Sequence, residues 1–444
     1  MRRNLLLWSI TSALAGFLFG FDTVVISGAE KDIQSVWHLE AGLHGVAIAS
    51  ALYGTVAGSM LGGWPADRFG RRSTLIIIGG LYLVGALGSA FATSVYDFIA
   101  ARAVGGLGIG MSTVVAPLYI AEISPPDRRG RLTGLFQLNI VVGIVIAYVS
   151  NAALSGLGPN AWRWMIGVAA IPSVVYTLLC VSLPESPRWL LGRKRDRAGG
   201  IRVLRQIYPS TAAAQIEADA DLILRGMDTT PQKAAFWNRS LRKPIQLAMA
   251  IAFFNQMSGI NAILYYAPRI FELSGLGSRA ALLQSTGIGV TNLVFTLVGL
   301  RLIDRLGRRM LLFVGSLGYI LSLGITAYAF FSGHFFLVPA CIFTFIASHA
   351  VGQGVTIWVY IAEIFPDRYR AEGQALGSFT HWILAATLTT LFPQIVTAFP
   401  PGDVFAFFAL MMVLQLIWVK TSVVETKGIP LETIAGKLNV DRAA

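Results

Sequence analysis

The chain has 444 residues and a formal net charge of +12, with 55% hydrophobic and only 13% charged residues. Soluble domains carry roughly 25% charged residues, and the mean hydropathy of this chain is +0.64. No soluble core has room for that much apolar surface. The composition therefore excludes a soluble globular protein and indicates one that resides in a membrane.

Apolar runs recur along the whole chain, and each is long enough for a helix to cross the hydrocarbon core of a bilayer. There are twelve of them, at residues 5–28, 43–65, 73–92, 97–119, 132–155, 162–183, 243–270, 280–303, 310–331, 335–361, 372–397 and 402–424. We therefore predict an all-α membrane protein with twelve transmembrane helices.

The basic residues are unevenly distributed between successive loops. They cluster in alternate loops, at Arg68 to Arg72, Arg128 to Arg131, Arg188 to Lys243, Arg301 to Arg309 and Arg368 to Arg370. The intervening loops carry few charges. This asymmetry is the positive-inside pattern of membrane proteins and predicts that both termini are cytoplasmic. The basic excess thus sets topology, and we expect no nucleic-acid partner.

One charged string occurs twice. The pattern Asp-Arg-x-Gly-Arg-Arg stands at residues 67–72 and again at 304–309, 237 residues later. A second set recurs with an offset of 241, as Glu122, Pro125 and Arg129 and then Glu363, Pro366 and Arg370. A repeat of about half the chain length is typical of two-halved transporters. We expect six-helix halves at residues 1–187 and 244–428, followed by a short cytoplasmic tail at 429–444.

The polar stretch at residues 188–243 separates the two halves. Within it, Asp196 to Tyr208 and Ala212 to Arg225 show helical spacing of Ile, Val and Leu among charged residues. We predict short amphipathic helices on the cytoplasmic face. A disordered linker is the alternative, although the moderate charge of the segment favours helices.

Two ionisable residues, Asp22 and Arg102, lie deep within apolar spans. An unpaired charge in hydrocarbon is costly, so each marks a functional-site hypothesis. The two residues are expected to pair across the bundle. A rearrangement that separates them would favour proton uptake by the carboxyl group, which is a proton-coupling device. The alternative is a structural ion pair that does not titrate during transport.

Several strings along the chain carry a family resemblance. They are Gly20-Phe21-Asp22-Thr23, the two Asp-Arg-x-Gly-Arg-Arg strings, Pro117 to Glu122, Pro184-Glu185-Ser186-Pro187-Arg188, Gln256 to Asn261, Tyr265-Tyr266-Ala267-Pro268 and Glu425-Thr426-Lys427-Gly428. With these strings in order, the chain resembles the sugar porter family of the major facilitator superfamily, and in particular its bacterial proton-coupled xylose and hexose members. In such members the position of Asp22 is Asp, whereas uniporting glucose carriers commonly have Asn.

A sugar needs amides that match its hydroxyl groups and an aromatic ring against its apolar face, because each buried hydroxyl must find a partner. Polar and aromatic side chains of these kinds occur within the spans. The candidate substrate-binding residues are Gln137, Asn255, Gln256, Asn261, Asn292, Trp358, His381 and Trp382. The resemblance implies sugar contacts for Gln137, Gln256, Asn261, Asn292 and Trp358, and an extracellular gate at Tyr265 and Tyr266. The alternative for any single amide is hydrogen bonding between helices.

Charged residues at the cytoplasmic ends of the spans form the expected cytoplasmic gate, closed by ion pairs between the halves. They are Asp67, Arg71, Glu122, Arg129, Glu185, Arg188, Asp304, Arg308, Glu363, Arg370 and Glu425. The alternative is solvated caps whose exposed pairs contribute only ~0–1 kcal/mol each. Their repetition in both halves favours the gate, and weak individual pairs suit a latch that opens in every cycle.

The chain departs from the family pattern at several places, which include Asn139, where the family often has Gly, and Ala385, which is Asn in the glucose facilitators. Asn255 stands where these carriers usually have a second Gln, and His381 occupies a site that is usually Asn or Gln. The segment Gly354 to Ile357 lacks the prolines often seen before the tryptophan at 358. These departures leave the substrate open among pentoses, hexoses and cyclic polyols.

We predict a secondary active transporter of sugar and protons that works by alternating access, with the sugar held mainly by the C-terminal half. The open alternatives are a passive sugar uniporter, a transport-inactive sugar receptor and a drug exporter. The five histidines are scattered without ligand spacing, so we expect neither an enzyme nor a metal or cofactor site. The expected setting is a bacterial inner membrane, and the family expectation is a monomer.

Overall fold

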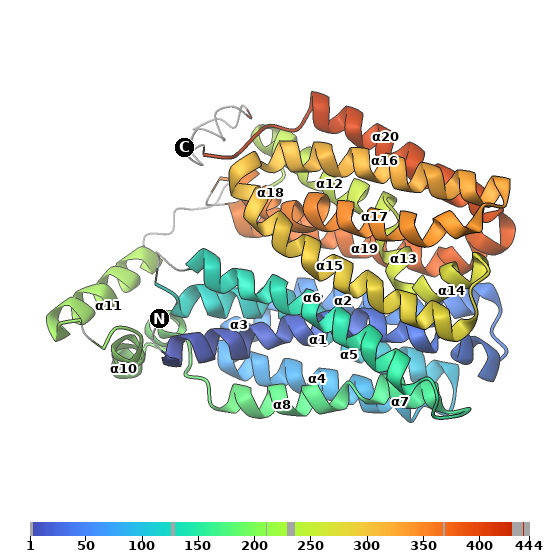
Figure 1. Ribbon diagram of the computed structural model, residues 1–444. Helices are drawn as coiled ribbons and strands as arrows, with labels where there is room; N and C mark the ends of the chain where they lie inside the picture. Colours follow the sequence, from blue (N-terminus) through green and yellow to red (C-terminus); the bar gives the residue numbers. More distant parts are fainter. Residues whose placement is uncertain are drawn as a thin grey trace. The chain divides into compact units, whose positions relative to one another are not determined.

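The computed structural model describes residues 3–125, 129–209, 211–228, 236–366, 369–428 and 438. All regular structure in these ranges is helical (Figure 1). The α-helices are α1 (Arg3–Val36), α2 (Ala41–Leu61), α3 (Gly63–Phe69), α4 (Arg71–Ala90), α5 (Val95–Ile123), α6 (Arg129–Leu154), α7 (Ala161–Gly167), α8 (Ala170–Val181), α9 (Pro187–Gly192), α10 (Arg197–Ile207), α11 (Ala213–Asp228), α12 (Arg242–Met257), α13 (Ile260–Tyr265), α14 (Ala267–Leu273), α15 (Ser278–Leu306), α16 (Arg308–Ser332), α17 (Val338–His349), α18 (Val355–Ile364), α19 (Arg370–Ala398) and α20 (Pro401–Thr421). Two 3-10 turns, η1 (Arg239–Leu241) and η2 (Phe335–Leu337), and a π-helical turn, η3 (Ala350–Gly354), complete the set.

The predicted fold class is confirmed. In the described ranges, 12 helical segments are long and apolar enough to cross a membrane, and each overlaps one of the predicted runs. The largest difference lies in the first segment, which continues to Val36 and includes the charged residues 30–32. The sequence analysis ended this run at residue 28 because charges follow, whereas Glu30 is buried and paired.

Three of the predicted runs are interrupted helices. The sixth is divided into α7 and α8, and the seventh breaks at Gly259, whose φ of +82° is the left-handed conformation that favours glycine. The tenth changes from α17 to the π-helical turn η3 and then to α18. Such breaks inside membrane helices occur where helices line functional sites. Hydropathy alone does not reveal them.

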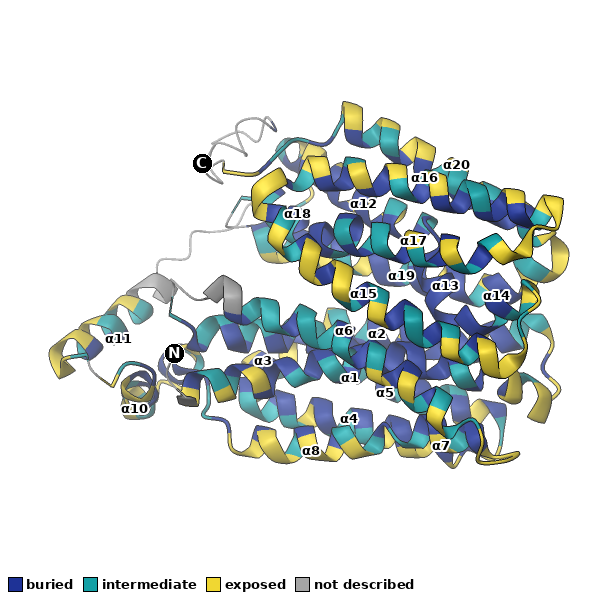
Figure 2. Cartoon of the chain, viewed as in Figure 1, coloured by how far each residue is buried: buried dark blue, intermediate teal, exposed yellow. Residues whose placement is uncertain are grey.

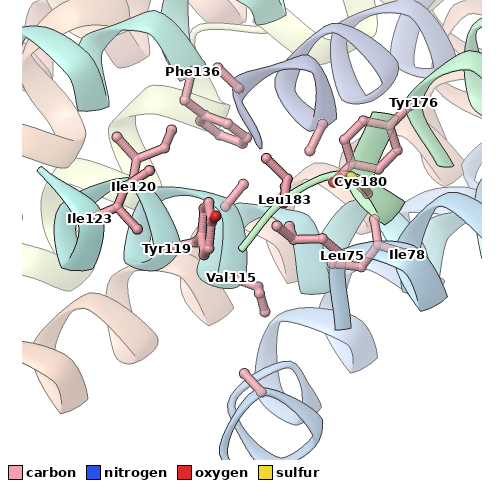
Figure 3. Packing of buried hydrophobic residues seen from close by; sticks show 14 of the residues in the cluster. Leu75, Ile78, Val115, Tyr119, Ile120, Ile123, Phe136, Tyr176, Cys180 and Leu183 are labelled. Carbon is pink, nitrogen blue, oxygen red and sulfur yellow. The ribbon is translucent and has the colours of Figure 1, made fainter. Parts of the chain in front are cut away.

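By packing, the chain divides into two units. The first comprises Met1–Asp22, Gly54–Gly143 and Ile166–Lys233, and the second comprises Thr23–Tyr53, Ile144–Met165 and Ala234–Ala444. In the first unit α4 packs against α5 and α8. Figure 3 shows its apolar core, in which Tyr119 and Val115 of α5 lie among residues of α4, α6 and α8. The Tyr119 hydroxyl group donates to the carbonyl of Pro184 at 2.8 Å.

Close helix packing in the first unit depends on glycine. A Cβ atom on Gly110 of α5 would lie 2.2 Å from the carbonyl oxygen of Thr55 on α2. On the opposite side of α5, Gly105 faces Gly85 of α4, where a Cβ atom would lie 2.6 Å from the Cα atom of Gly105. Both distances are too short for a side chain, so these helices approach backbone to backbone.

The second unit contains the C-terminal helices together with parts of α1, α2, α6 and α7. Within it α16 packs on α20, and α12 packs on α19. The parts contributed by earlier helices make direct polar contacts. The hydroxyl group of Tyr148 on α6 donates to the carbonyl of Leu264 at 2.9 Å, and the hydroxyl groups of Tyr53 and Thr390 lie 2.9 Å apart. The second unit therefore joins helices from both sequence halves.

Exposed apolar side chains mark the faces turned toward lipid. On α8, Ile171, Val175 and Leu178 are 64%, 50% and 67% exposed and follow helical spacing along one face (Figure 2). An exposed apolar stripe of this kind is unfavourable in water but favourable against the hydrocarbon core of a membrane.

The two amphipathic helices expected between the halves are present as α10 and α11. The side chain of Asp196 caps α10 by accepting from the backbone N–H of Gly199 at 2.8 Å. Arg197 of α10 forms ion pairs with Glu217 and Asp221 of α11. A small apolar cluster, Leu191, Leu204, Ile216 and Ala220, packs beneath these pairs.

Candidate functional site

The two ionisable residues expected within the spans lie side by side in the first unit. Arg102 Nη1 donates to Asp22 Oδ1 at 2.6 Å, and Nη2 donates to the backbone carbonyl of Asp22 at 3.3 Å. The exposed fractions of the two side chains are 2% for Arg102 and 9% for Asp22. This is a buried ion pair between α1 and α5, and breaking such a pair is costly because it leaves an uncompensated charge.

The pair is incompletely satisfied. Among the described residues, Asp22 Oδ2 and Arg102 Nε have no hydrogen-bond partner. A buried carboxylate oxygen without a partner marks a place for a further interaction, which for a carboxylate is most simply a proton. The geometry thus provides a carboxylate held by a cation through one oxygen, while the other oxygen has no hydrogen-bond partner among the described residues.

The charged strings at the ends of the spans form two matching clusters, one in each unit. In the first, Arg71 Nε and Nη2 donate to the two carboxylate oxygens of Glu122, both at 3.0 Å. In the second, Arg308 Nε and Nη2 donate to Glu363 at 3.0 and 2.7 Å. Bidentate Arg–carboxylate pairs are the strongest of this type. The described contacts join helices within each half of the sequence.

Each cluster also contains an acidic residue that caps the N-terminus of a helix, and the two caps match each other. Glu185 Oε1 accepts from the backbone N–H groups of Arg71 and Arg72 at 2.8 and 3.1 Å, at the start of α4. Glu425 accepts from the corresponding groups of Arg308 and Arg309, at 3.0 and 3.1 Å, at the start of α16. A carboxylate at a helix N-terminus is stabilised by the helix dipole. Burial nevertheless raises the pKa of Glu185, against the effect of these N–H donors.

The glycine in each charged string makes room for the capping carboxylate. Gly70 and Gly307 have φ values of +94° and +90°. A Cβ atom on Gly70 would lie 2.2 Å from Glu185 Oε2, and one on Gly307 would lie 2.5 Å from Glu425 Oε2. The repeated Asp-Arg-x-Gly-Arg-Arg string is therefore explained by its geometry: Gly admits the carboxylate and the next Arg binds the other Glu.

The remaining residues of the predicted cytoplasmic gate occupy varied settings. Asp67 and Asp304 lie 3.2 and 3.5 Å from Arg71 and Arg308, respectively. Arg370 Nε donates to the carbonyl of Ala362 at 3.0 Å. Arg188 is exposed on α9, and the side chain of Arg129 lies outside the described residues.

Four of the predicted sugar-binding residues form one hydrogen-bonded cluster in the second unit. Gln256 Nε2 donates to Asn255 Oδ1 at 2.9 Å and lies 3.2 Å from His381 Nδ1. Asn261 Nδ2 donates to Gln256 Oε1 at 2.8 Å. The break at Gly259 allows this arrangement, because it brings the start of α13 back toward the end of α12. We call Asn255, Gln256, Asn261 and His381 the amide cluster.

Aromatic rings adjoin the amide cluster. The ring of His381 lies 5.0 Å from that of Trp358 and 4.6 Å from that of Trp382, measured between centroids. Trp358 is partly exposed, whereas Trp382 and His381 are buried. The combination of amides and an accessible indole face matches what a sugar ring requires.

The other predicted sugar-site residues are not joined to this cluster. Asn292 on α15 accepts from Thr296 of its own helix at 3.3 Å. Gln137 on α6 belongs to the first packing unit. The expected gate tyrosines are both buried, and the hydroxyl group of Tyr266 donates to the carbonyl of Thr389 at 3.2 Å.

The sequence analysis missed a buried charged group in the second unit. Glu30 and His44 are each at most 1% exposed, and His44 Nε2 lies 3.2 Å from Glu30 Oε2. Arg269 of α14 lies 3.5 Å from the same carboxylate and donates to Gln34 at 3.2 Å. Lys31 forms an ion pair with Glu272. The only signal in the sequence was the charge of Glu30, two residues after the apolar run at 5–28. Hydropathy treats such a charge as the end of the run.

A separate cavity of about 940 Å³ lies where α12 begins and α20 ends. Its lining includes Arg239, Arg242, Lys243 and Arg309 but none of the predicted sugar-binding residues. A neutral sugar requires matched donors and acceptors rather than a cluster of cations. The amide cluster is therefore the better candidate for the sugar site.

Twelve apolar helices, a charged string repeated in two halves and a polar site inside the helices define a polytopic membrane carrier. A family model described as "Sugar (and other) transporter" matches residues 8–438. The chain belongs to this family, and it is a membrane transporter rather than an enzyme.

Curated relatives align with this chain over nearly its whole length. The "Arabinose-proton symporter" of Bacillus subtilis (strain 168) is 32% identical over 437 residues, which cover 97% of this chain and 94% of that protein. The "D-xylose-proton symporter" of Escherichia coli (strain K12) is 32% identical over 468 residues, with 96% and 94% covered.

Among solved structures, the inward open conformation of the xylose transporter XylE from E. coli has a TM-score of 0.86 and 29% sequence identity. The match covers 97% of this chain and 98% of that one. The predicted family, fold and transporter class are thereby confirmed.

The bidentate pair in the first cluster leads to a prediction. We expect Arg71→Lys to lower the free energy of unfolding by about 1–3 kcal/mol, because an ammonium group cannot satisfy both oxygens of the partly buried Glu122 carboxylate. Arg308→Lys should have a similar effect through Glu363. Melting temperatures in detergent measure the change, with Arg205→Lys on the exposed face of α10 as the control. Equal melting temperatures for all four proteins would contradict a stabilising role.

Proposed function

We propose that this protein is a sugar:proton symporter that works by alternating access, with a pentose, a hexose or a cyclic polyol as substrate. The observation that carries the proposal is the buried pair of Asp22 and Arg102, with one carboxylate oxygen open to protonation. The names of relatives, which include arabinose-proton and D-xylose-proton symporters, support it. Each of the two sequence halves contributes six of the twelve spans.

The proton step rests on the cost of an unpaired charge in hydrocarbon. While Arg102 donates to Asp22, the carboxylate is compensated and stays ionised. When the helices rearrange and Arg102 moves away, the carboxylate is left without a partner and takes up a proton instead. Proton binding is thus linked to conformation through a single contact between α1 and α5.

The sugar step rests on the amide cluster and Trp358. Amide groups offer both donors and acceptors, so they replace the water that each sugar hydroxyl loses on binding. The partly exposed indole of Trp358 supplies an apolar surface for the face of the ring. All these residues belong to the C-terminal half of the sequence and to the second unit, and Asn292 of α15 is added to the proposed site from the same unit. A sugar contact for Gln137 of α6 stays a prediction from the family resemblance.

The orientation follows from the distribution of basic residues. Both termini and helices α10 and α11 lie in the cytoplasm, as do the clusters around Arg71 and Arg308. The group formed by Glu30, His44 and Arg269 then lies toward the extracellular side, near the gate tyrosines. The two charged clusters hold the cytoplasmic ends of the helices within each half. A cytoplasmic gate closed by ion pairs between the halves stays a prediction.

Coupling to protons has a clear energetic use. A gradient equivalent to about 150 mV supplies ~3.5 kcal/mol per proton. At one proton per sugar this sustains accumulation of a few hundred-fold. A passive uniporter is the second candidate, and it differs only in that Asp22 never changes its charge.

The variant Asp22→Asn tests the proton step. We expect it to abolish accumulation of sugar against its gradient, because the amide cannot carry the proton, while exchange of sugar at equilibrium continues. Uptake of labelled sugar into proteoliposomes, with and without an imposed pH gradient, measures both. Asp403→Asn, which removes an exposed carboxylate from α20, serves as the control. Uphill uptake by Asp22→Asn would remove Asp22 from the coupling mechanism.

The variant Gln256→Ala tests the sugar step. We expect the apparent dissociation constant for the transported sugar to rise at least fivefold, because about 1–3 kcal/mol is lost when buried polar partners are left unpaired. Quenching of tryptophan fluorescence or equilibrium binding measures it. Gln246→Ala, on the exposed face of the same helix, should leave affinity unchanged. If both variants bind equally well, Gln256 is not part of the site.

A further inference from the structure

Two buried glutamines next to the amide cluster have no role in the site described so far. Gln353 is 1% exposed and belongs to the π-helical turn η3, and Gln415 is fully buried in α20. Burying an amide is costly unless its donors and acceptors are satisfied. In this chain both side chains are hydrogen-bonded to each other, and they continue the hydrogen bonds of the amide cluster.

The side chains form one uninterrupted chain of hydrogen bonds. Beyond the bond from Asn261 to Gln256 and that from Gln256 to Asn255, Asn255 Nδ2 donates to Gln353 Oε1 at 3.4 Å. Gln353 Nε2 donates to Gln415 Oε1 at 2.9 Å. Gln415 Nε2 in turn donates to Ser316 Oγ at 2.7 Å.

The direction of this chain is set at its far end. The hydroxyl group of Ser316 donates to the carbonyl of Leu312 in its own helix at 2.7 Å, so its oxygen must accept from Gln415. Gln415 therefore turns its NH₂ group toward Ser316 and its oxygen toward Gln353. For the same reason, Gln353 turns its NH₂ group toward Gln415 and its oxygen toward the NH₂ group of Asn255. Every amide in the chain donates in one direction, and such chains strengthen their members cooperatively.

Gln353 also compensates for a departure noted in the sequence. Asn255 stands where related carriers usually have Gln, and its side chain is one methylene shorter. The oxygen of Gln353 lies within hydrogen-bond distance of the shorter side chain, although at 3.4 Å this is the longest link. Gln353 belongs to the π-helical turn η3, which comes shortly before Trp358 in a segment that contains no proline. The hydrogen bond between Asn255 and Gln353 therefore joins two of the places where the chain departs from the family pattern.

We propose that Ser316, Gln415 and Gln353 are positioning residues that hold the amides of the sugar site in one orientation and thereby determine which sugar hydroxyls the site accepts. The inference rests on the proposed sugar-binding function of the amide cluster. In the observed orientation, the NH₂ groups of Asn255 and Asn261 each use one hydrogen within the chain, which leaves the other for a hydroxyl oxygen of the sugar. A reversed chain would present oxygens at these places.

The test removes the hydroxyl group of Ser316, the last acceptor of the chain, without changing any residue of the amide cluster. Ser316→Ala deletes the acceptor for Gln415, whereas Ser316→Thr retains a hydroxyl group. Ser322→Ala is the matched control, because Ser322 is an equally buried serine on α16 whose hydroxyl donates to the carbonyl of Gly318 in its own helix at 2.7 Å. Gln415→Met interrupts the chain from α20, so that a packing defect at position 316 alone does not decide the result.

The readouts are equilibrium dissociation constants for the sugar that the wild-type protein binds best and for its single-deoxy analogues, together with melting temperatures. We expect Ser316→Ala and Gln415→Met to weaken binding of the best sugar about five- to tenfold and to weaken binding of at least one deoxy analogue much less, so that discrimination falls. Ser316→Thr should restore both affinity and discrimination. A merely structural role would lower melting temperature but leave the ratio between sugar and analogue unchanged.

Two results would overturn the inference, and they are distinguishable. If the wild-type protein binds no sugar, polyol or analogue, the proposed function fails and the inference fails with it. If the wild-type protein binds sugar and Ser316→Ala and Gln415→Met discriminate as well as Ser322→Ala, the inference alone fails. A loss of discrimination in both variants, with rescue by Ser316→Thr, supports it.

Discussion

Hydrocarbon offers no partner for a charge or a hydrogen bond, and this constraint accounts for the polar structure of the protein. A buried polar group is costly unless another side chain or a backbone group satisfies it. Arg102 is therefore held by Asp22, and the arginines of the repeated strings are held by Glu122 and Glu363. Under the same constraint, a group that loses its protein partner needs a substitute. In the proposed mechanism this substitute is a proton for the Asp22 carboxylate and a sugar hydroxyl group for an amide.

The two sequence halves use this constraint in different ways. The repeated strings build nearly identical clusters, in which Gly70 and Gly307 each admit a capping carboxylate beside a bidentate Arg–Glu pair. The interiors differ. The first half buries a charged pair, suited to a proton, and the second half buries a neutral amide chain, suited to a sugar. Duplication thus explains the shared ends of the helices, and divergence of their middles explains why one half buries a charged pair and the other a chain of neutral amides.

Much of this was predictable from the sequence, for physical reasons. Long apolar runs and alternate basic loops identify a polytopic membrane protein, and a charge such as Asp22 within such a run needs a partner, which Arg102 provides. The breaks at Gly259 and at η3 were not predictable, because they depend on tertiary packing rather than on hydropathy. The Glu30–His44 pair was missed since charges normally end a span. Gln353 and Gln415 escaped notice because a single glutamine in a span does not reveal which amides it will meet.

Coupling between proton and sugar is measured by sugar-induced proton movement in proteoliposomes, followed with a pH-sensitive dye while pentoses, hexoses and inositol are added in turn. We expect that one of these compounds makes the external medium more alkaline as protons enter with it, and that Asp22→Asn removes the signal. Equilibration of labelled sugar by the wild-type protein without any proton movement would contradict the account, and would identify a uniporter in which the pair of Asp22 and Arg102 is purely structural.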